Sequence, residues 1–155
     1  PELPRLPGLQ WLDLGYRRSN LGAHQVVLWA DYELRPGDRE EGEAMLSEIV
    51  RWRREHQPGG HNAGSVFTNP FQGSAGQLID EAGMRGVRCG SAFVSPKHAN
   101  FIQSEEGGSA ADVLALIRKV HDEVLARTGV ALHPEVRLVG FTDEELGDVL
   151  GASAP

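Results

Sequence analysis

Cysteine is nearly absent from this sequence of 155 residues, which contains only Cys89. A single cysteine cannot form a disulfide within the chain, and this favours a protein of a reducing compartment. Long apolar runs are absent as well, and no signal peptide is visible, so we expect no membrane partner. Together these absences indicate a cytoplasmic protein.

An excess of positive charge is also lacking, because acidic residues outnumber basic ones and the formal net charge is −7. Nucleic-acid-binding surfaces are usually basic, so we expect no nucleic-acid partner. A local arginine cluster can still attract an anionic small molecule against this net charge. His56 and His61 are separated by four residues across a Pro-Gly-Gly loop, which is poor ligand spacing, and we expect no metal site.

The N-terminus lacks a methionine and is rich in proline. The sequence begins with Pro1, and three of its first seven residues are prolines. We interpret this as a fragment cut from a longer chain, although a processed terminus would look the same. The length suffices for one domain or for two small ones that share a core.

The first half of the chain shows one strand pattern and one helix pattern. Apolar and polar residues alternate over residues 25–34, which predicts a strand with one buried face. Residues 39–56 predict a helix, because Met45, Ile49 and Trp52 form an apolar stripe at helical spacing. Acidic residues near its start and arginines near its end complement the helix dipole. The arginines are therefore more typical of a solvated helix end than of a phosphate clamp.

The second half predicts further helices and short strands. In chain order, we predict a helix at 74–82, two strands around a turn at 95–98, a helix at 109–128, a strand at 130–139 and a short helix from 142. Ser109 and Thr142 are the expected N-caps, with Asp112 and Glu145 three residues later, as in a capping box. Gly129 suits the end of the longer helix. We therefore expect an α+β fold, a small mixed or antiparallel sheet with packed helices.

One stretch, HNAGSVFTNP at 61–70, gathers the groups that chemistry can use. Gly64 lets the backbone approach a ligand closely. Ser65 offers one O–H donor and two acceptor lone pairs. Asn69 precedes Pro70 and is expected to be extended or in a turn. In isolation the stretch is typical of a loop that enters a strand.

Five short motifs follow one another along the chain. They are GYRRS at 15–19, AGSVFTNP at 63–70, AGQLID at 75–80, VSPKHANFI at 94–102 and PEVR at 134–137. Each is weak alone, but five in this order resemble the C-terminal half of the UDP-N-acetylenolpyruvoylglucosamine reductases, over about residues 15–140. The resemblance implies a cytoplasmic FAD flavoprotein of peptidoglycan synthesis, and hence of cell-wall formation, cell shape and division. It would use NADPH to reduce UDP-N-acetylglucosamine enolpyruvate to UDP-N-acetylmuramate.

The resemblance implies three catalytic positions. The flavin passes hydride to the β-carbon of the substrate, and the enolate that results needs charge stabilisation and a proton at its α-carbon. Ser65 matches the proton donor, and Arg17 matches the arginine that binds the carboxylate with its planar fork. Glu135 matches the glutamate beside that group and would need a raised pKa to donate a proton. Taken alone, Arg17 is typical of a surface arginine, and Glu135 of an exposed pair with Arg137.

The resemblance also implies substrate-binding positions at Asn69, Tyr16 and His56. Asn69 matches a contact to the UDP part of the substrate, and Tyr16 lies in the motif at 15–19. His56 stands near a position where some members carry a phosphate-binding lysine. Thr68 stands where the family often has lysine, so the diphosphate loses one positive charge.

The resemblance divides the chain unevenly. Residues 1–38 and 134–155 look like remnants of the flavin-binding portion, 39–56 is a connecting helix, and 57–133 is the substrate-binding domain. The glycine-rich segments that hold the FAD pyrophosphate are not in this sequence. We therefore expect FAD to be bound mainly by a missing N-terminal portion, and the fragment alone to be inactive. The alternatives are a non-redox nucleotide-sugar-binding module and a structural remnant that binds nothing.

Overall fold

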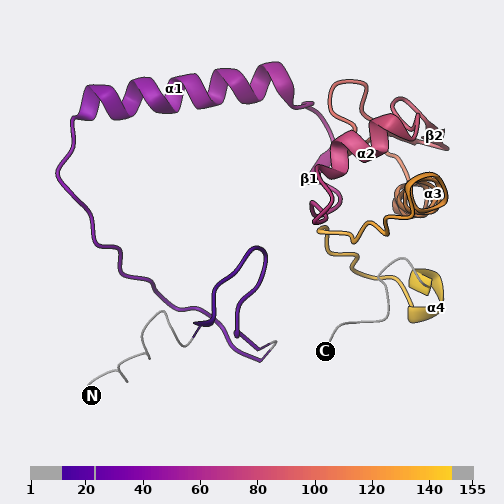
Figure 1. Ribbon diagram of the computed structural model, residues 1–155, viewed down its shortest axis with the longest axis horizontal. Coiled ribbons are helices and arrows are strands. Elements are labelled where there is room, and N and C mark those ends of the chain that lie inside the picture. Colours follow the sequence, from indigo (N-terminus) through magenta and orange to yellow (C-terminus); the bar gives the residue numbers. More distant parts are fainter. Residues whose placement is uncertain (1–11, 23, 148–155) are drawn as a thin grey trace. The chain divides into compact units, whose positions relative to one another are not determined.

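A computed structural model describes residues 12–22 and 24–147 of the chain (Figure 1). The chain divides into two compact units, Pro1–Asp38 and Arg39–Pro155, and each unit is described here by itself. Predictions that concern residues 1–11 and 148–155 lie outside the described residues. Among the described helices, none combines the length and the apolar character that a membrane span requires.

The first unit contains no helix or strand between residues 25 and 38. The strand predicted over residues 25–34 is therefore wrong. A strand exists only when its N–H and C=O groups pair with a neighbour, and no described residue forms a ladder with this segment. Its apolar side chains lie open to solvent, since Val26, Leu28 and Leu34 are 78–83% exposed.

The second unit begins with α1, Arg39–His56, and the predicted helix is confirmed. Glu40 lies in its first turn and Arg53 in its last, as the dipole argument predicted. None of its residues is buried. A hydrogen bond from the Lys97 ammonium to the Arg54 carbonyl joins the end of the helix to the turn at 95–98.

Four short antiparallel strands form the sheet of the second unit. They are β1 Asn62–Ser65, β2 Arg88–Cys89, β3 Ala92–Val94 and β4 Phe101–Ser104, in the spatial order β1-β4-β3-β2. The predicted pair of strands around the turn at 95–98 corresponds to β3 and β4. Since helices pack beside this antiparallel sheet, the predicted α+β class is confirmed (Figure 1).

The core lies between the sheet and the helices α2, Ala75–Glu81, and α3, Ala110–Thr128. Helix α3 contacts β2, β3, β4 and α2. The largest fully buried side chains come from α2, from α3 and from the segments that follow β1 and α3; they are Phe67, Ile79, Leu116, Ile117 and Leu132. The motif stretch at 61–70 therefore enters the core directly.

The helix ends follow the predicted caps with one change. The hydroxyl of Ser109 caps α3, and Gly129 ends it in the left-handed conformation. The N–H of Ser109, however, donates to the hydroxyl of Ser91 at 2.9 Å, and that hydroxyl donates to Asp112 at 2.7 Å. Ser91 thus stands between the two residues of the expected capping box. Its hydrogen bonds, the backbone one above all, hold the pKa of Asp112 below its usual value.

The last described helix is α4, Asp143–Leu146. Thr142 and Glu145 form the predicted capping box in full, because each side chain accepts a hydrogen bond from the backbone N–H of the other residue. These bonds from Thr142 hold the pKa of Glu145 below its usual value.

The strand predicted over residues 130–139 is wrong, since this segment forms only an isolated bridge between Pro134 and Phe67. Proline has no N–H, so it interrupts a ladder of hydrogen bonds. The pairing on either side is nevertheless firm. The Thr68 N–H donates to the His133 carbonyl at 2.9 Å, and the Glu135 N–H donates to the Val66 carbonyl at 2.7 Å.

Candidate active site

Ser65 stands at the end of β1, directly after a β-bulge. Asn62 pairs with Gln103 and Ser65 with Phe101, so two residues of β1 lie opposite one of β4. Gly64 occupies the bulge with a φ of 84°, which a residue without a Cβ adopts at little cost. Bulges change the direction of the next side chain and often lie beside active sites. The bulge therefore sets the direction of the Ser65 hydroxyl.

Asn62 organises the turn that leads into the bulge. Its Nδ2 donates to the carbonyls of Gly59 and Gly60, at 3.3 and 3.1 Å, and its Oδ1 accepts from the Gly64 N–H at 3.0 Å. Sequence reasoning missed this residue. An asparagine two residues before a glycine is a recognisable signal, because asparagine side chains commonly bond to the backbone two residues on.

The backbone of Val66 brings Ser65 and Glu135 to the same place. Ser65 precedes Val66 in the chain, and the Val66 carbonyl accepts the hydrogen bond from Glu135. Both residues are half-buried. Of the three expected catalytic residues, the structure therefore brings these two together although they are far apart in sequence.

Asn100 holds the segment after Ser65 from the other side. The Phe67 N–H donates to Asn100 Oδ1 at 2.9 Å, and Asn100 Nδ2 donates to the Phe67 carbonyl at 2.8 Å. The Val66 N–H donates to the Asn100 carbonyl at 2.9 Å. Asn100 lies in the motif at 94–102, and no role was predicted for it from the sequence.

Asn69 orders the start of α2. Its Oδ1 accepts from the Ala75 N–H at 3.0 Å, next to the Ser74 N-cap. The residue itself is exposed. Since the carbonyl arm is engaged with the backbone, the amide arm is the part of Asn69 that a ligand would use.

His56 lies at the C-terminal end of α1 and packs on its own helix. Its Nδ1 is 2.8 Å from the Trp52 carbonyl, and the two rings stack with centroids 4.6 Å apart. With Nδ1 bonded to a carbonyl oxygen, Nδ1 carries the proton, and Nε2 is the nitrogen that a ligand would meet.

Arg17 and Tyr16 belong to the first unit, on a tight turn. The N–H and C=O groups of Gly15 and Arg18 pair across this turn at 3.0 and 3.2 Å. Arg17 has a φ of 56°, a conformation that costs a residue with a side chain some strain and is often found at functional sites. Its guanidinium lies 5.5 Å from the centre of the Tyr16 ring. The convergence of Arg17 with Glu135 stays a prediction.

An ion pair supports the turn at 95–98 next to the site. The Arg85 guanidinium donates two hydrogen bonds of 2.7 Å each to the Asp80 carboxylate. It donates a third, also of 2.7 Å, to the Pro96 carbonyl. The hydrogen bonds from Arg85 hold the pKa of Asp80 below its usual value. Burial, followed by the charge of Arg85, lowers the pKa of His98, whose neutral Nδ1 accepts from the Asn100 N–H at 3.2 Å.

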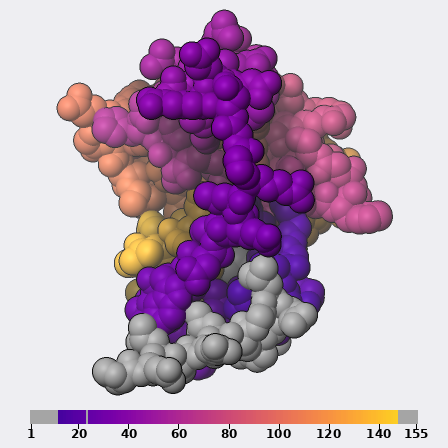
Figure 2. Space-filling model, turned by 90° about the vertical axis from the view of Figure 1, so that its left-hand side faces the viewer, coloured from indigo at the N-terminus to yellow at the C-terminus, as the bar shows by residue number. Residues whose placement is uncertain are grey.

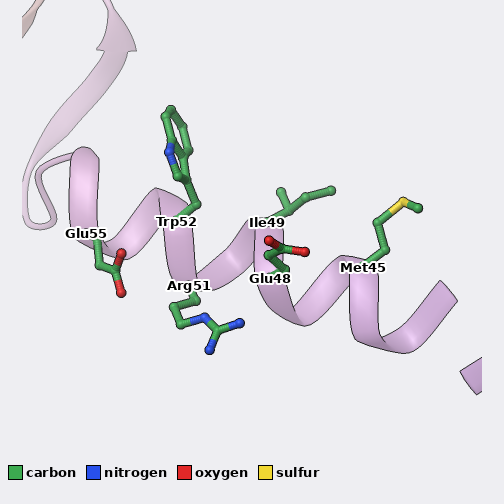
Figure 3. Close-up of a pocket in the computed structure, with 6 residues that line it drawn as sticks. All are labelled: Met45, Glu48, Ile49, Arg51, Trp52 and Glu55. Atoms are coloured by element: carbon green, nitrogen blue, oxygen red, sulfur yellow. The ribbon is translucent and has the colours of Figure 1, made fainter. Parts of the chain in front are cut away.

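One surface hollow lies along α1, and one of its lining residues, Trp52, is the stacking partner of His56. It is lined by Met45, Glu48, Ile49, Arg51, Trp52 and Glu55, all from one helix (Figure 3). No expected site residue lines it. Within residues 12–22 and 24–147, no three histidine, cysteine, aspartate or glutamate side chains cluster as metal ligands.

The space beside Gly64 fits the approach of a bound group. A Cβ placed on Gly64 would meet no atom within 4 Å, so the backbone before Ser65 is open on that side. Such an opening at a glycine next to a hydroxyl lets a ring or a substrate come close to the chain. It is compatible with a flavin and a substrate meeting at Ser65.

Comparison with known proteins gives one consistent result. Residues 56–139 match the sequence model of the UDP-N-acetylenolpyruvoylglucosamine reductase C-terminal domain. A reductase of that name from Heliobacterium modesticaldum is 50% identical over 132 residues, which cover 83% of this chain and 42% of the relative. Its namesake from Geobacter metallireducens is 42% identical over 134 residues, covering 86% and 45%.

A solved structure agrees with the sequence comparisons. The UDP-N-acetylenolpyruvylglucosamine reductase (MurB) of Thermus caldophilus superposes with a TM-score of 0.67 at 36% identity. The match covers 79% of this chain and 44% of the Thermus chain. The chain therefore spans less than half the length of the relatives it matches.

Proposed function

Because this chain belongs to the UDP-N-acetylenolpyruvoylglucosamine reductase family, we propose that it forms the substrate-binding part of such a reductase. The reaction is the reduction of UDP-N-acetylglucosamine enolpyruvate to UDP-N-acetylmuramate, with NADPH as reductant, in peptidoglycan precursor synthesis in the cytoplasm. The observation that carries the proposal is the meeting of Ser65 and Glu135 at the backbone of Val66.

The proposed mechanism assigns one task to each of three side chains. FAD, when bound, supplies the hydride that reaches the β-carbon of the enolpyruvyl group. Ser65 holds a proton over the α-carbon and delivers it to the enolate, in a direction set by the bulge at Gly64. Arg17 binds the substrate carboxylate, and Glu135, in its protonated form, would donate a hydrogen bond to the negative charge that develops beside it.

We assign the nucleotide part of the substrate to Asn69, His56 and Tyr16, as the family resemblance implies. Asn69 would use its amide arm, because its carbonyl arm caps α2. His56 would offer Nε2, because Nδ1 is bonded to the Trp52 carbonyl. Tyr16 would act from the turn that it shares with Arg17. The N–H and the hydroxyl of Thr68 both donate to the His133 carbonyl. Thr68 therefore does not replace the positive charge of the lysine that the family often has at this position.

The proposed organisation assigns 57–133 to the substrate-binding domain, with α1 as the connecting helix. Residues 1–38 and 134–155 then belong with a flavin-binding portion, most of which lies outside this chain and which would bind most of the FAD. The division of the chain after Asp38 supports the first of these boundaries.

The test is the Ser65→Ala variant of the complete reductase that contains this chain. Flavin reduction by NADPH should be nearly unchanged, whereas reoxidation of the flavin by substrate should slow about 10²–10⁴-fold, the usual worth of a positioned proton donor. Stopped-flow measurement of the two half-reactions separates these effects. Ser104→Ala, at the far end of β4, is the matched control and should leave both unchanged. Near-normal reoxidation in Ser65→Ala would contradict the assignment.

The second candidate is a nucleotide-sugar-binding module without redox activity. It is favoured by the second unit having its own sheet and core. Calorimetry with UDP-N-acetylglucosamine and a visible absorption spectrum after addition of FAD distinguish the two. Sugar-nucleotide binding without any flavin band or NADPH oxidation in the complete protein would favour the module.

A further inference from the structure

Asn100 is a buried polar residue to which the mechanism above assigns no task. It is 4% exposed, and in the described part of the chain Ser95 is the only other buried polar residue. A carboxamide in an apolar core costs free energy unless both of its ends are hydrogen-bonded. Both ends of the Asn100 carboxamide are bonded to the backbone of one residue, Phe67. The oxygen accepts from the Phe67 N–H, and the nitrogen donates to the Phe67 C=O.

The carboxamide of Asn100 continues the pairing of β1 with β4 beyond the last strand pair. The ladder reaches Ser65, and the Val66 N–H then bonds to the Asn100 carbonyl. The backbone of β4 pairs no further, because Asn100 lies in a turn. A carboxamide carries the same donor and acceptor as a peptide group. The side chain of Asn100 therefore pairs with Phe67 where the backbone of another strand residue would otherwise stand.

The segment 66–68, which we name the central strip, is held from both sides. Asn100 bonds to it on one side, and His133 and Glu135 bond to it on the other. Ser65 precedes the central strip directly. Any shift of the strip therefore moves Ser65 and the attachment point of Glu135 together.

We propose that Asn100 is a positioning residue for the proton-transfer step, acting through the central strip on Ser65 and Glu135. This inference rests on the function proposed above. Asn100 touches no reacting atom, but its carboxamide holds the peptide units 66–67 and 67–68, which begin one residue after Ser65. A misplacement of about 1 Å at a reacting group can cost on the order of 100-fold in rate. Flavin reduction by NADPH does not involve Ser65 and so does not depend on Asn100.

The first test is Asn100→Asp in the complete reductase. The carboxylate has nearly the same volume, but it places an acceptor where the Phe67 carbonyl requires a donor. Reoxidation of the flavin by substrate should slow about 100-fold, while its reduction by NADPH stays within about twofold. Gln77→Glu is the matched control, because it makes the same change in an exposed amide on α2, which donates to Glu81 and bonds to no residue of the central strip. It should leave both half-reactions unchanged.

The second test combines Asn100→Asp with Ser65→Ala. If Asn100 acts through Ser65, the double variant should reoxidise about as slowly as Ser65→Ala alone, because residues that act as a unit are not additive. Losses that multiply would show that Asn100 acts independently of Ser65 and would overturn the proposal. Equal slowing of both half-reactions by Asn100→Asp would overturn it as well, because that is the signature of general structural damage.

A milder variant covers the case in which Asn100→Asp does not fold. Asn100→Ser keeps one hydroxyl near the Phe67 backbone. It should again slow flavin reoxidation more than flavin reduction, but by a smaller factor than Asn100→Asp. Equal effects on both half-reactions in this variant would again overturn the proposal. Failure of the proposed function is visible separately, since the unmodified enzyme would then not be reoxidised by the substrate at all.

Discussion

The helices α1 and α3 are almost equal in length, with 18 and 19 residues, but only one of them has a surface to pack against. Helix α3 buries five residues against the sheet and α2, namely Leu114, Leu116, Ile117, Val120 and Val124. Helix α1 carries an apolar stripe at the same spacing, yet its Met45, Ile49 and Trp52 are 47–63% exposed. Figure 2 shows side chains of α1, in purple, at the molecular surface.

The difference teaches that an apolar stripe makes a helix possible without giving it a place in a core. The backbone hydrogen bonds of a helix close within the helix, so α1 forms from its own sequence. Burial needs an opposing apolar surface, and most of the stability of a helix in a protein comes from that packing. The two helices should therefore respond differently to the same substitutions.

The largest difference is expected for truncation of a leucine. Leu116→Ala in α3 removes a side chain with no exposed surface and should lower the free energy of unfolding by about 2–5 kcal/mol. Leu46→Ala in α1, where the side chain is 63% exposed, should change it by less than about 0.5 kcal/mol. Urea unfolding of the two variants measures both values. Equal losses would show that α1 is packed as firmly as α3.

A smaller difference in stability is expected for glycine-to-alanine substitutions. In this case the variant in α3 should be destabilised and the variant in α1 stabilised. Gly129 ends α3 with a φ of 71°, so Gly129→Ala should destabilise the chain by roughly 1–2 kcal/mol. Gly42 lies inside α1 with a Cβ position open to solvent, and Gly42→Ala should stabilise the helix by about 1 kcal/mol. Thermal unfolding, followed by circular dichroism at 222 nm, shows whether each variant is more or less stable than the unmodified chain. A gain in stability for Gly129→Ala would contradict the left-handed cap.

The smallest expected effect is a dependence of the free energy of unfolding on pH, which comes from His98 in the second unit. The pKa of His98 is lowered by burial and by Arg85, so between the folded and unfolded values the unfolded chain binds more protons. The stabilising contribution is complete above the unfolded pKa of about 6.5, and it is lost as the pH falls through the folded value. His98→Gln should flatten this part of the stability curve, measured by urea unfolding between pH 7 and about pH 5. A curve that keeps its slope in the variant would assign the effect to another group.

Local features were predictable because their hydrogen bonds lie within a few residues. The extent of α1, the N-cap at Ser109, the end at Gly129 and the capping box of Thr142 and Glu145 all follow from short-range patterns. Two of the predicted strands, at 25–34 and 130–139, were wrong for different reasons. Residues 25–34 find no partner among the described residues, and the segment at 130–139 is interrupted by Pro134.

The candidate site was only partly visible in the sequence. Ser65 and Glu135 were named from their motifs, but no pattern indicated that both attach at Val66. Asn62 and Asn100 were missed as structural elements of the site. Asn62 acts within its own turn and carries a local signal, whereas Asn100 bonds to Phe67 across a distance in sequence that no periodicity spans.

The sequence by itself determined the helices, their ends, the order of the five motifs and the family that those motifs indicate. The reason is that helix propensity, capping and turn chemistry depend on neighbours within one or two turns of chain. Only the tertiary structure decided which apolar segments were buried, which extended segments paired and which residues met at Ser65. Those outcomes depend on hydrogen bonds and contacts between distant segments, whose partners exist only once the chain has folded.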